Sequence, residues 1–388
     1  MDFSLPPEYH ALRRMVRDFC ERELRPVIRQ MDHEEYTPMD IVSKAAAAGF
    51  MGVPFPKKYG GAGAGEIGYC VLMQELARWD ASFSTIIGAH VGIGAMPIYI
   101  DGSEELKEKY LTRLAKGELL AAFALTEAGA GSDAAGIRMS AVREGDSYFL
   151  DGSKMWITNG PIADIIVVLA NTDATLGPRG GQTCFVVEKE WDGFSVGAAE
   201  HKMGLHGSPT SVLNFDGVRV PQENVLGQVG LGFVTFMRTL DLGRITIGAA
   251  GLGGAERALE WSLRWARARQ QFGQAIAHNQ SVHFMLADMA TETEALRSLV
   301  YRTAWMVDNH MPFTKEAGMC KLFGSEVSSR CCDRAVQIHG ALGISRDFPG
   351  ERAYRDARIS EIFEGTNEIQ RIVIASELLQ QEGVRIRP

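Results

Sequence analysis

The sequence has no CxxC pair, no long basic run and no signal-peptide-like N-terminus. Its six cysteines and nine histidines show no ligand-like spacing, so we expect reduced thiols, no metal site and no His-based catalytic triad. The lack of basic runs and the net charge of −8 disfavour nucleic acid as a partner. The N-terminal residues predict a cytoplasmic protein, or a mitochondrial matrix protein if a transit peptide has been removed.

One stretch, residues 81–100, carries no charged side chain. It contains Gly88, Gly92, Gly94 and Pro97 and has little of the long aliphatic content of a membrane span. We therefore expect no membrane insertion and interpret the stretch as a buried helix that lines a pocket.

The 388 residues are 46% hydrophobic and 23% charged, which is typical of a globular protein of two or three domains. Helical periodicity dominates residues 1–117, for example over residues 9–29 and 39–48. Short β-branched runs separated by turn residues dominate residues 118–226, and Asp216-Gly217 is interpreted as one of these turns. Long helical patterns return over residues 227–388. The order predicts an α+β protein with an N-terminal helical domain, a middle antiparallel β domain and a C-terminal helical bundle.

The most informative stretch is residues 358–368, where Glu364 lies between Phe363 and Gly365 just before an amphipathic helix. Thr366 or Asn367 is the expected N-cap of that helix. A carboxylate held at an apolar turn loses solvation, so its pKa rises and it becomes a usable base near neutral pH. The alternative is an exposed glutamate in a loop between helices.

A second motif, residues 123–133, combines glycines with hydroxyl side chains. It lacks the G-x-G-x-x-G order and the βαβ context of a dinucleotide fingerprint. Its backbone N–H groups are suited either to a plain turn or to a ring edge or pyrophosphate.

A third motif, residues 154–160, places Trp156 near Thr158 on an expected strand. Trp156 could cover one face of an aromatic ring while Thr158 donates a hydrogen bond to the edge of the ring. The alternative is a core tryptophan with a strand threonine. Asp241 and Arg244 open a bundle helix and are suited to a simple salt bridge. Arg269 to Gly273 has the pattern Arg-x-x-Phe-Gly, and residues 337–341 read Gln-Ile-His-Gly-Ala.

Taken together and in this order, the motifs resemble those of the acyl-CoA dehydrogenase family across nearly the whole chain. The resemblance implies that family's fold, with a middle β-barrel and a C-terminal four-helix bundle, and FAD as cofactor. It makes Glu364, directly before Gly-Thr, the catalytic base. Gly243 stands where isovaleryl-type and long-chain members carry their base, so the chain is more similar to short- and medium-chain members.

The resemblance also assigns the remaining site residues. Asp241, Arg244, Gly365 and Ser132 are expected to contact substrate, and Gln337 is expected to meet the adenine side of FAD on a neighbouring subunit. The residues expected to bind FAD are Phe123, Leu125, Thr126, Ser132, Trp156, Ile157, Thr158, Arg269, Phe272, Gln280, Gln337, His339, Gly340, Ala341, Thr366, Asn367 and Glu368.

The implied reaction is α,β-dehydrogenation of an acyl-CoA to a trans-2-enoyl-CoA, with short or short-branched acyl chains favoured and residues 87–96 lining the acyl end. The implied partners are an electron-transferring flavoprotein and further copies of this chain in a homotetramer. The alternatives are an acyl-CoA oxidase, a dehydrogenase of a cyclic, aromatic-pathway or dicarboxylyl-CoA, and a catalytically dead flavin-binding protein. Residues 81–100 contain no arginine, which argues against a dicarboxylyl substrate.

Overall fold

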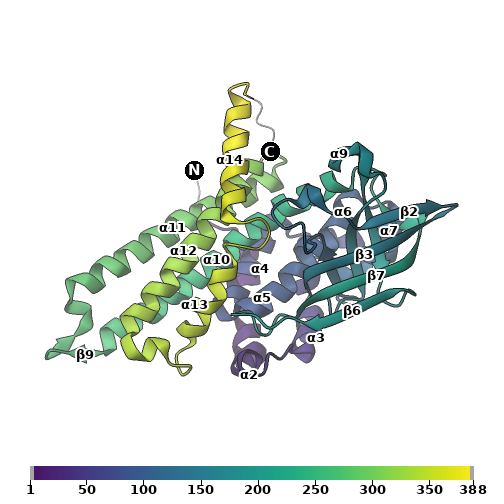
Figure 1. The fold of residues 1–388 in the computed structure, drawn as a ribbon. Coiled ribbons are helices and arrows are strands. Elements are labelled where there is room, and N and C mark those ends of the chain that lie inside the picture. Colours follow the sequence, from purple (N-terminus) through teal and green to yellow (C-terminus); the bar gives the residue numbers. More distant parts are fainter. Residues whose placement is uncertain (1–3, 385–388) are drawn as a thin grey trace.

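The computed structural model describes residues 4–384, and its elements follow the predicted α–β–α order. Figure 1 shows the long bundle helices on one side, the sheet on the other, and the N-terminal helices α4 and α5 between them. The predicted three-part fold is confirmed, and the junctions between its parts are where the candidate site lies.

The N-terminal part is built mostly from short helices. The helix expected over residues 9–29 is interrupted, because Pro26 lacks the N–H that a helix interior needs. The α-helices are α1 (Pro7–Phe19), α2 (Ile28–Glu34), α3 (Met39–Ala47), α4 (Gly65–Trp79), α5 (Ala81–Gly88), α6 (Met96–Asp101), α7 (Glu104–Leu106) and α8 (Thr112–Ala115). The π-helical segments are η1 (Cys20–Leu24), η4 (Ala89–Ala95) and η5 (Lys107–Leu111), and two 3₁₀ turns span Phe50–Gly52 and Lys57–Tyr59.

The uncharged stretch forms α5, η4 and α6 in one continuous run, Ala81–Asp101. By length and composition the run passes as a membrane span, but 72% of its most apolar window is buried inside the protein. The buried-helix interpretation therefore holds. The π-helical turn in its centre is a distortion that proteins often place at functional sites.

The middle part is one eight-stranded sheet with the order β6-β7-β3-β2-β4-β5-β8, and β1 pairs with β4. Its strands are β1 (Ala121–Ala124), β2 (Ser140–Glu144), β3 (Ser147–Thr158), β4 (Ile165–Asn171), β5 (Gln182–Glu188), β6 (Phe194–Ala199), β7 (Thr210–Pro221) and β8 (Val225–Leu226). Most pairs are antiparallel, as predicted. The exceptions are β1–β4 and β2–β4, which are parallel.

The turn predicted at Asp216-Gly217 is wrong, because β7 continues through both residues. Opposite them β3 contributes only Asp151, since the register changes between the Leu150–Val218 and Gly152–Phe215 pairs. Gly217 adopts φ +61° there. The two residues form a β-bulge, which uses the same glycine conformation as a turn and therefore has the same sequence signature.

The C-terminal part is a bundle whose longest helix, α10, packs against α4, α11 and α12. Its helices are α10 (Gly232–Ala268), α11 (Gln280–Asp308), α12 (Thr314–His339), α13 (Pro349–Ile359) and α14 (Asn367–Gln381). A small hairpin of β9 (Gln270–Gln271) and β10 (Gln274–Ala275) joins α10 to α11. The apolar residues that recur at helical spacing along α11 are buried at Val282, Met289, Leu296 and Val300. All six cysteines are free and buried, as predicted.

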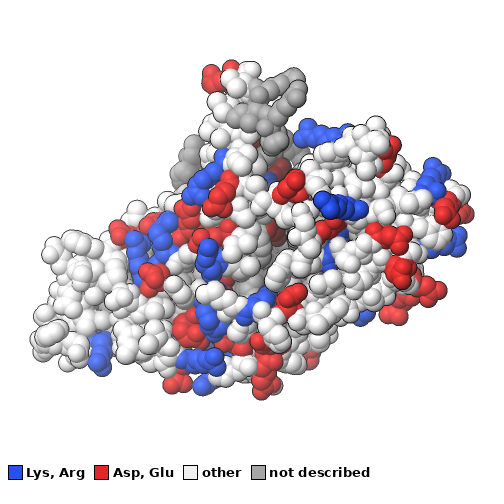
Figure 2. Space-filling view, in the orientation of Figure 1, with Lys and Arg blue, Asp and Glu red and all other residues white. Residues whose placement is uncertain are grey.

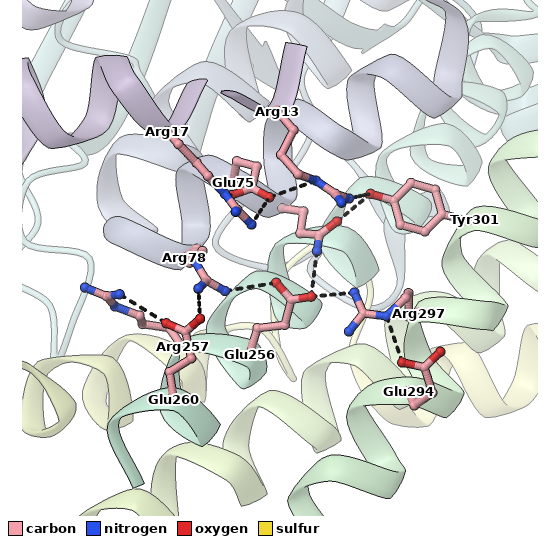
Figure 3. A network of polar contacts seen from close by, with 11 residues as sticks. Arg13, Arg17, Glu75, Arg78, Glu256, Arg257, Glu260, Glu294, Arg297 and Tyr301 are labelled. Carbon is pink, nitrogen blue, oxygen red and sulfur yellow. Dashed lines mark hydrogen bonds and ion pairs between the residues drawn. The ribbon is translucent and has the colours of Figure 1, made fainter. Parts of the chain in front are cut away.

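A network of charged side chains joins the N-terminal helices to the bundle (Figure 3). The fully buried carboxylate of Glu75 on α4 pairs with Arg13 at 3.1 Å and Arg17 at 2.7 Å, both from α1. Glu256 on α10 pairs with Arg78 of α4 at 3.2 Å and with Arg297 of α11 at 2.5 Å. The Arg78–Glu256 pair joins α4 to α10, and other parts of the same two helices border the candidate site.

Candidate active site

Glu364 lies in the turn between α13 and α14 with a left-handed backbone, φ 51°, and Gly365 follows at φ +91°. A non-glycine residue in this region is uncommon and is found where the surrounding structure enforces it. Thr366 is the N-cap of α14, since its hydroxyl accepts the Ile369 N–H at 3.3 Å. The predicted cap and the predicted helix are both confirmed.

Gln370 holds this turn from inside the protein. Its fully buried amide donates to the carbonyl oxygens of Glu364 at 3.3 Å and Gly365 at 3.0 Å. A Cβ at Gly365 would lie 2.7 Å from Gln370 Nε2, so only glycine lets this side chain close over the turn. The backbone of the catalytic candidate is therefore fixed by contacts within α14 itself.

The Glu364 carboxyl points toward α10. Its Oε2 atom is buried and has no hydrogen-bond partner within residues 4–384. A Cβ at Gly243 would lie 2.4 Å from Oε2 and 3.4 Å from Ile93 of η4. The carboxyl thus occupies the space that the missing side chain at 243 leaves open, beside the stretch expected to line the acyl end.

Burial raises the pKa of the Glu364 carboxyl to about 7, and the positive charges of Arg244 and Lys321 oppose this rise. A carboxyl with such a pKa is half ionised near neutral pH and serves well as a general base. A buried acceptor without a partner is also rare in folded proteins, and a catalytic role is one of the reasons for keeping it. The loop-glutamate alternative does not fit this geometry.

Arg244 and Asp241 form a salt bridge at 2.5 Å, and Thr314 donates to Asp241 at 2.9 Å. Arg244 is only 5% exposed, and its Nη2 would be 3.7 Å from a Cβ at Gly365. Arg244 is therefore directed at the turn that carries Glu364, and its positive charge lies beside the candidate base, whereas the contacts of Asp241 are to Arg244 and Thr314.

The loop after β1 is anchored by Lys154, whose side chain is fully buried. Its Nζ donates to the carbonyl of Leu125 at 3.0 Å and to Glu127 at 2.8 Å. Burial lowers the pKa of Lys154 to about 8 against the opposing charge of Glu127. Thr126 lies between these two contacts, and Ser132 lies beyond them on the exposed part of the loop.

Trp156 is displaced outward by a bulge in β3. The register with β7 changes between Lys154 and Ile157, and Trp156 adopts φ 61° there. Its side chain is 53% exposed, although it is a large apolar ring in a sheet, and Thr158 beside it is half-buried. Ile157 is different, because its side chain belongs to the core of the sheet and offers a cofactor only its backbone.

Another group of predicted FAD residues lies at the far end of the bundle. Phe272 in the β9–β10 hairpin is 96% exposed with φ 53°, and Arg269, Gln280 and Gln337 are exposed near it. Figure 1 shows this hairpin at the end of the molecule opposite the sheet, and Figure 2 shows few charged side chains there. One copy of the chain does not bring these residues to Trp156.

Within this far group, Gly340 and Ala341 are exposed just after α12, whereas His339 is 7% exposed. The His339 ring stacks on Phe348 at a centroid distance of 3.8 Å and on Trp265 at 5.2 Å. Its Nδ1 is 2.7 Å from the carbonyl of Ala335. These contacts give His339 a packing role at this end of the bundle.

Two of the predicted cofactor residues at α14 also differ in their placement. Glu368 is exposed, whereas Asn367 is 4% exposed and its Oδ1 accepts from Lys321 and Ser325. The Asn367 side chain is thus directed into the bundle and not toward a cofactor. Sequence reasoning did not identify Lys321, Lys154 and Gln370 as residues of the site. They could have been found as polar residues at positions where the helix or strand periodicity predicts a buried side chain.

Three family models match this chain: the acyl-CoA dehydrogenase N-terminal domain over residues 6–118, the middle domain over 122–218 and the C-terminal domain over 230–379. The chain therefore belongs to the acyl-CoA dehydrogenase family and is an FAD-dependent oxidoreductase.

Its relatives cover the chain almost completely. An acyl-CoA dehydrogenase of Bacillus subtilis is 45% identical over 372 residues, which are 96% of this chain and 98% of the relative. The CarC subunit of a caffeyl-CoA reductase–Etf complex of Acetobacterium woodii is 42% identical over 95% of this chain and 98% of the relative. The structure of butyryl-CoA dehydrogenase from Megasphaera elsdenii is similar with a TM-score of 0.96 and 41% identity, covering 98% of this chain and all of that chain.

Proposed function

We propose that this chain oxidises a short or short-branched acyl-CoA to the trans-2-enoyl-CoA, with Glu364 as the base that removes the α-proton. The observation that carries the proposal is the buried, unpartnered Oε2 of Glu364, held against Gly243. An α-hydrogen of a thioester is weakly acidic, so the base must be fixed in place and the developing enolate charge must be stabilised.

The backbone around Glu364 supports both requirements. The Glu364 N–H donates to no carbonyl within the described residues, so it is free to bond a thioester oxygen, as the family resemblance implies. Arg244 adds positive charge on the same side of the turn. The left-handed backbone of Glu364, locked by Gln370, keeps the N–H and the carboxyl of one residue directed at the same ligand.

The residues at the sheet fit an FAD ring. Trp156 presents an exposed aromatic face, Thr158 lies beside it, and the loop of residues 125–132 is fixed on the same strand by Lys154. FAD bound there would accept the β-hydrogen of the substrate as a hydride. The exposed bundle end with Arg269, Phe272 and Gln337 suits the adenine half of an FAD held by another copy. This supports an assembly of at least two copies, and the family resemblance implies a homotetramer.

A short acyl chain is supported by Tyr69 of α4. Its buried hydroxyl donates to the carbonyl of Gly88 at 3.2 Å, and a Cβ at Gly92 would lie 2.7 Å from it. Gly92 directly precedes Ile93, which borders the Glu364 carboxyl. The tyrosine ring thus fills space behind the expected acyl end, where a long chain would have to pass.

The test is anaerobic bleaching of the FAD-loaded protein by acyl-CoAs of four to sixteen carbons, and by isobutyryl-, 2-methylbutyryl- and glutaryl-CoA. We expect rapid bleaching by the four-carbon and short-branched substrates and none in Glu364→Gln. Bleaching by no acyl-CoA would refute the proposal, and bleaching restricted to the longest chains would refute the assignment of chain length.

Two further arms separate the alternatives. Rapid peroxide formation in air would identify an oxidase, whereas electron transfer to an electron-transferring flavoprotein supports the dehydrogenase. Because a 42% identical relative is named as a reductase subunit in a complex with Etf, the reduced protein is also mixed with an enoyl-CoA. If crotonyl-CoA reoxidises the flavin faster than butyryl-CoA reduces it, the protein would be assigned as an enoyl-CoA reductase.

A further inference from the structure

The Lys321 side chain of α12 is fully buried in the bundle although it carries a charge. No carboxylate of the described residues lies within salt-bridge distance of its Nζ, whose hydrogen bond goes to the neutral Oδ1 of Asn367 at 2.9 Å. A buried cation without a counter-ion is costly and is retained where its charge or its contact has a use.

The contact fixes the start of α14. Asn367 is the first residue of that helix, and its Oδ1 also accepts the Ser325 hydroxyl at 3.0 Å. Its N–H donates to the carbonyl of Glu361 at 3.0 Å, which closes the turn that carries Glu364. A displacement of Asn367 would therefore be transmitted directly to Glu364, three residues earlier.

The charge of Lys321 also acts on Glu364. Two cations face this carboxyl, Arg244 from α10 and Lys321 from α12, and the Tyr69 hydroxyl faces it from α4. Arg244 acts more strongly on Glu364 and is paired with Asp241 at 2.5 Å, whereas Lys321 has no paired carboxylate among the described residues.

The other acidic groups near Lys321 do not compensate for it at short range. Glu361 and Glu368, from the turn and from α14, act on Lys321 more weakly than Glu364 does. Glu361 is in addition bonded to Arg358 at 2.7 Å and to Ser329 at 2.6 Å. Of the two cations that act on the Glu364 carboxylate, Lys321 is therefore the one that no carboxylate of the described residues holds in an ion pair.

We propose that Lys321 is a positioning residue for the base: it holds the catalytic turn through Asn367 and favours the ionised form of Glu364 through its uncompensated charge. The inference rests on the proposed role of Glu364 and adds a residue to it that contacts neither substrate nor cofactor.

The test compares Lys321→Met with Lys321→Arg, and with the control Lys315→Met on the same helix, whose ammonium lies 3.5 Å from Glu316. The rate of anaerobic flavin reduction by butyryl-CoA is measured from pH 5.5 to 9.5. Because an opposite charge favours the ionised carboxyl, Lys321→Met should shift the rising limb of the pH–rate profile by about one unit to higher pH. The rate of flavin reduction in Lys321→Met should then be several-fold lower than in the parent protein at pH 7 and recover near pH 9. In Lys321→Arg and in the control, the rate should rise at the same pH as in the parent protein.

A variant at Asn367 separates the charge from the contact. Asn367→Asp keeps an acceptor for Lys321 and neutralises its charge, so it should shift the limb while α14 stays ordered. Amide hydrogen exchange of residues 364–370 reports on the contact alone and should accelerate in Lys321→Met but not in Asn367→Asp or Lys315→Met. This readout needs no turnover and remains available if Lys321→Met binds FAD poorly.

A uniform loss of rate at every pH in Lys321→Met, or an unchanged limb in both Lys321→Met and Asn367→Asp, would overturn the electrostatic role. Unchanged hydrogen exchange would overturn the anchoring role. If the parent protein is reduced by no acyl-CoA, the proposed function fails instead, and the exchange experiment still decides whether Lys321 orders the turn.

Discussion

Replacing Glu364 by glutamine should make the protein more stable at alkaline pH while it abolishes turnover. The pKa of this carboxyl is raised from 4.5 to about 7, so the folded protein holds the proton more tightly than the unfolded chain. Such a group contributes its full stability below the unfolded pKa, and that contribution is lost as the pH rises through the folded pKa.

The size of the effect follows from the shift. A difference of roughly 2.5 units corresponds to about 3 kcal/mol of stability that the parent protein loses between about pH 4.5 and pH 7. Glutamine has the same shape and no charge, so Glu364→Gln should avoid this loss. With an unfolding entropy on the order of 0.8 kcal/mol/K for a chain of this length, the Tm difference at pH 8 should be about 4 °C.

The assay is thermal unfolding of both proteins at pH 5 and pH 8, followed by far-UV circular dichroism at equal FAD content. The difference between variant and parent should be small at pH 5 and large at pH 8. Glu361→Gln on the same turn is the control, because it removes bonds to Arg358 and Ser329 and should destabilise at both values. A variant that is no more stable than the parent at pH 8 would refute the burial of Glu364 described above. Flavin reduction should fall by a factor on the order of 10² to 10⁴, so that Glu364→Gln shows no bleaching on the time scale of the parent reaction.

Three further substitutions test the surroundings of the base. Gly243→Ala puts a Cβ 2.4 Å from Glu364 Oε2, and because a side-chain end can move aside, the fold should persist while reduction slows by about 10²-fold, measured by stopped flow. Lys154→Met leaves Glu127 without its buried partner and should cost about 3 to 5 kcal/mol in denaturant unfolding and weaken FAD retention. Asp308→Ala removes a cap that accepts the first amides of α4 at 2.7 and 3.1 Å and should cost about 1 kcal/mol in the same unfolding assay.

The controls use the same elements. Gly254→Ala, also on α10, meets only the Ser328 hydroxyl at 3.0 Å and should leave the rate of flavin reduction unchanged, so equal slowing would contradict the argument from Gly243. Lys202→Met also removes a partly buried lysine of the middle part, whose bond is to the carbonyl of Ser208 at 2.9 Å. It should cost clearly less than Lys154→Met, because no carboxylate is left unpaired.

Much of this protein is determined locally and was therefore open to prediction from the sequence. Turn residues and periodicity marked the α–β–α order, because strand and helix periods are properties of neighbouring residues. The Glu364-Gly365-Thr366 string marked the proposed base and the observed helix cap, since capping depends on a few consecutive residues. The prediction from local sequence failed at Asp216-Gly217, because a β-bulge and a turn both use a glycine with a left-handed backbone and therefore look alike in the sequence.

Only the tertiary structure decided which distant residues meet Glu364. Gly243 is 121 positions away and is recognised as the space for the carboxyl only when α10 packs beside the turn. Lys321 carries the same charge as any surface lysine, and its burial against Asn367 follows from the packing of α12 on α14. The pKa of Glu364 is likewise a property of the packed site, because desolvation and charge depend on what three helices bring together and not on the neighbours of Glu364 in the chain.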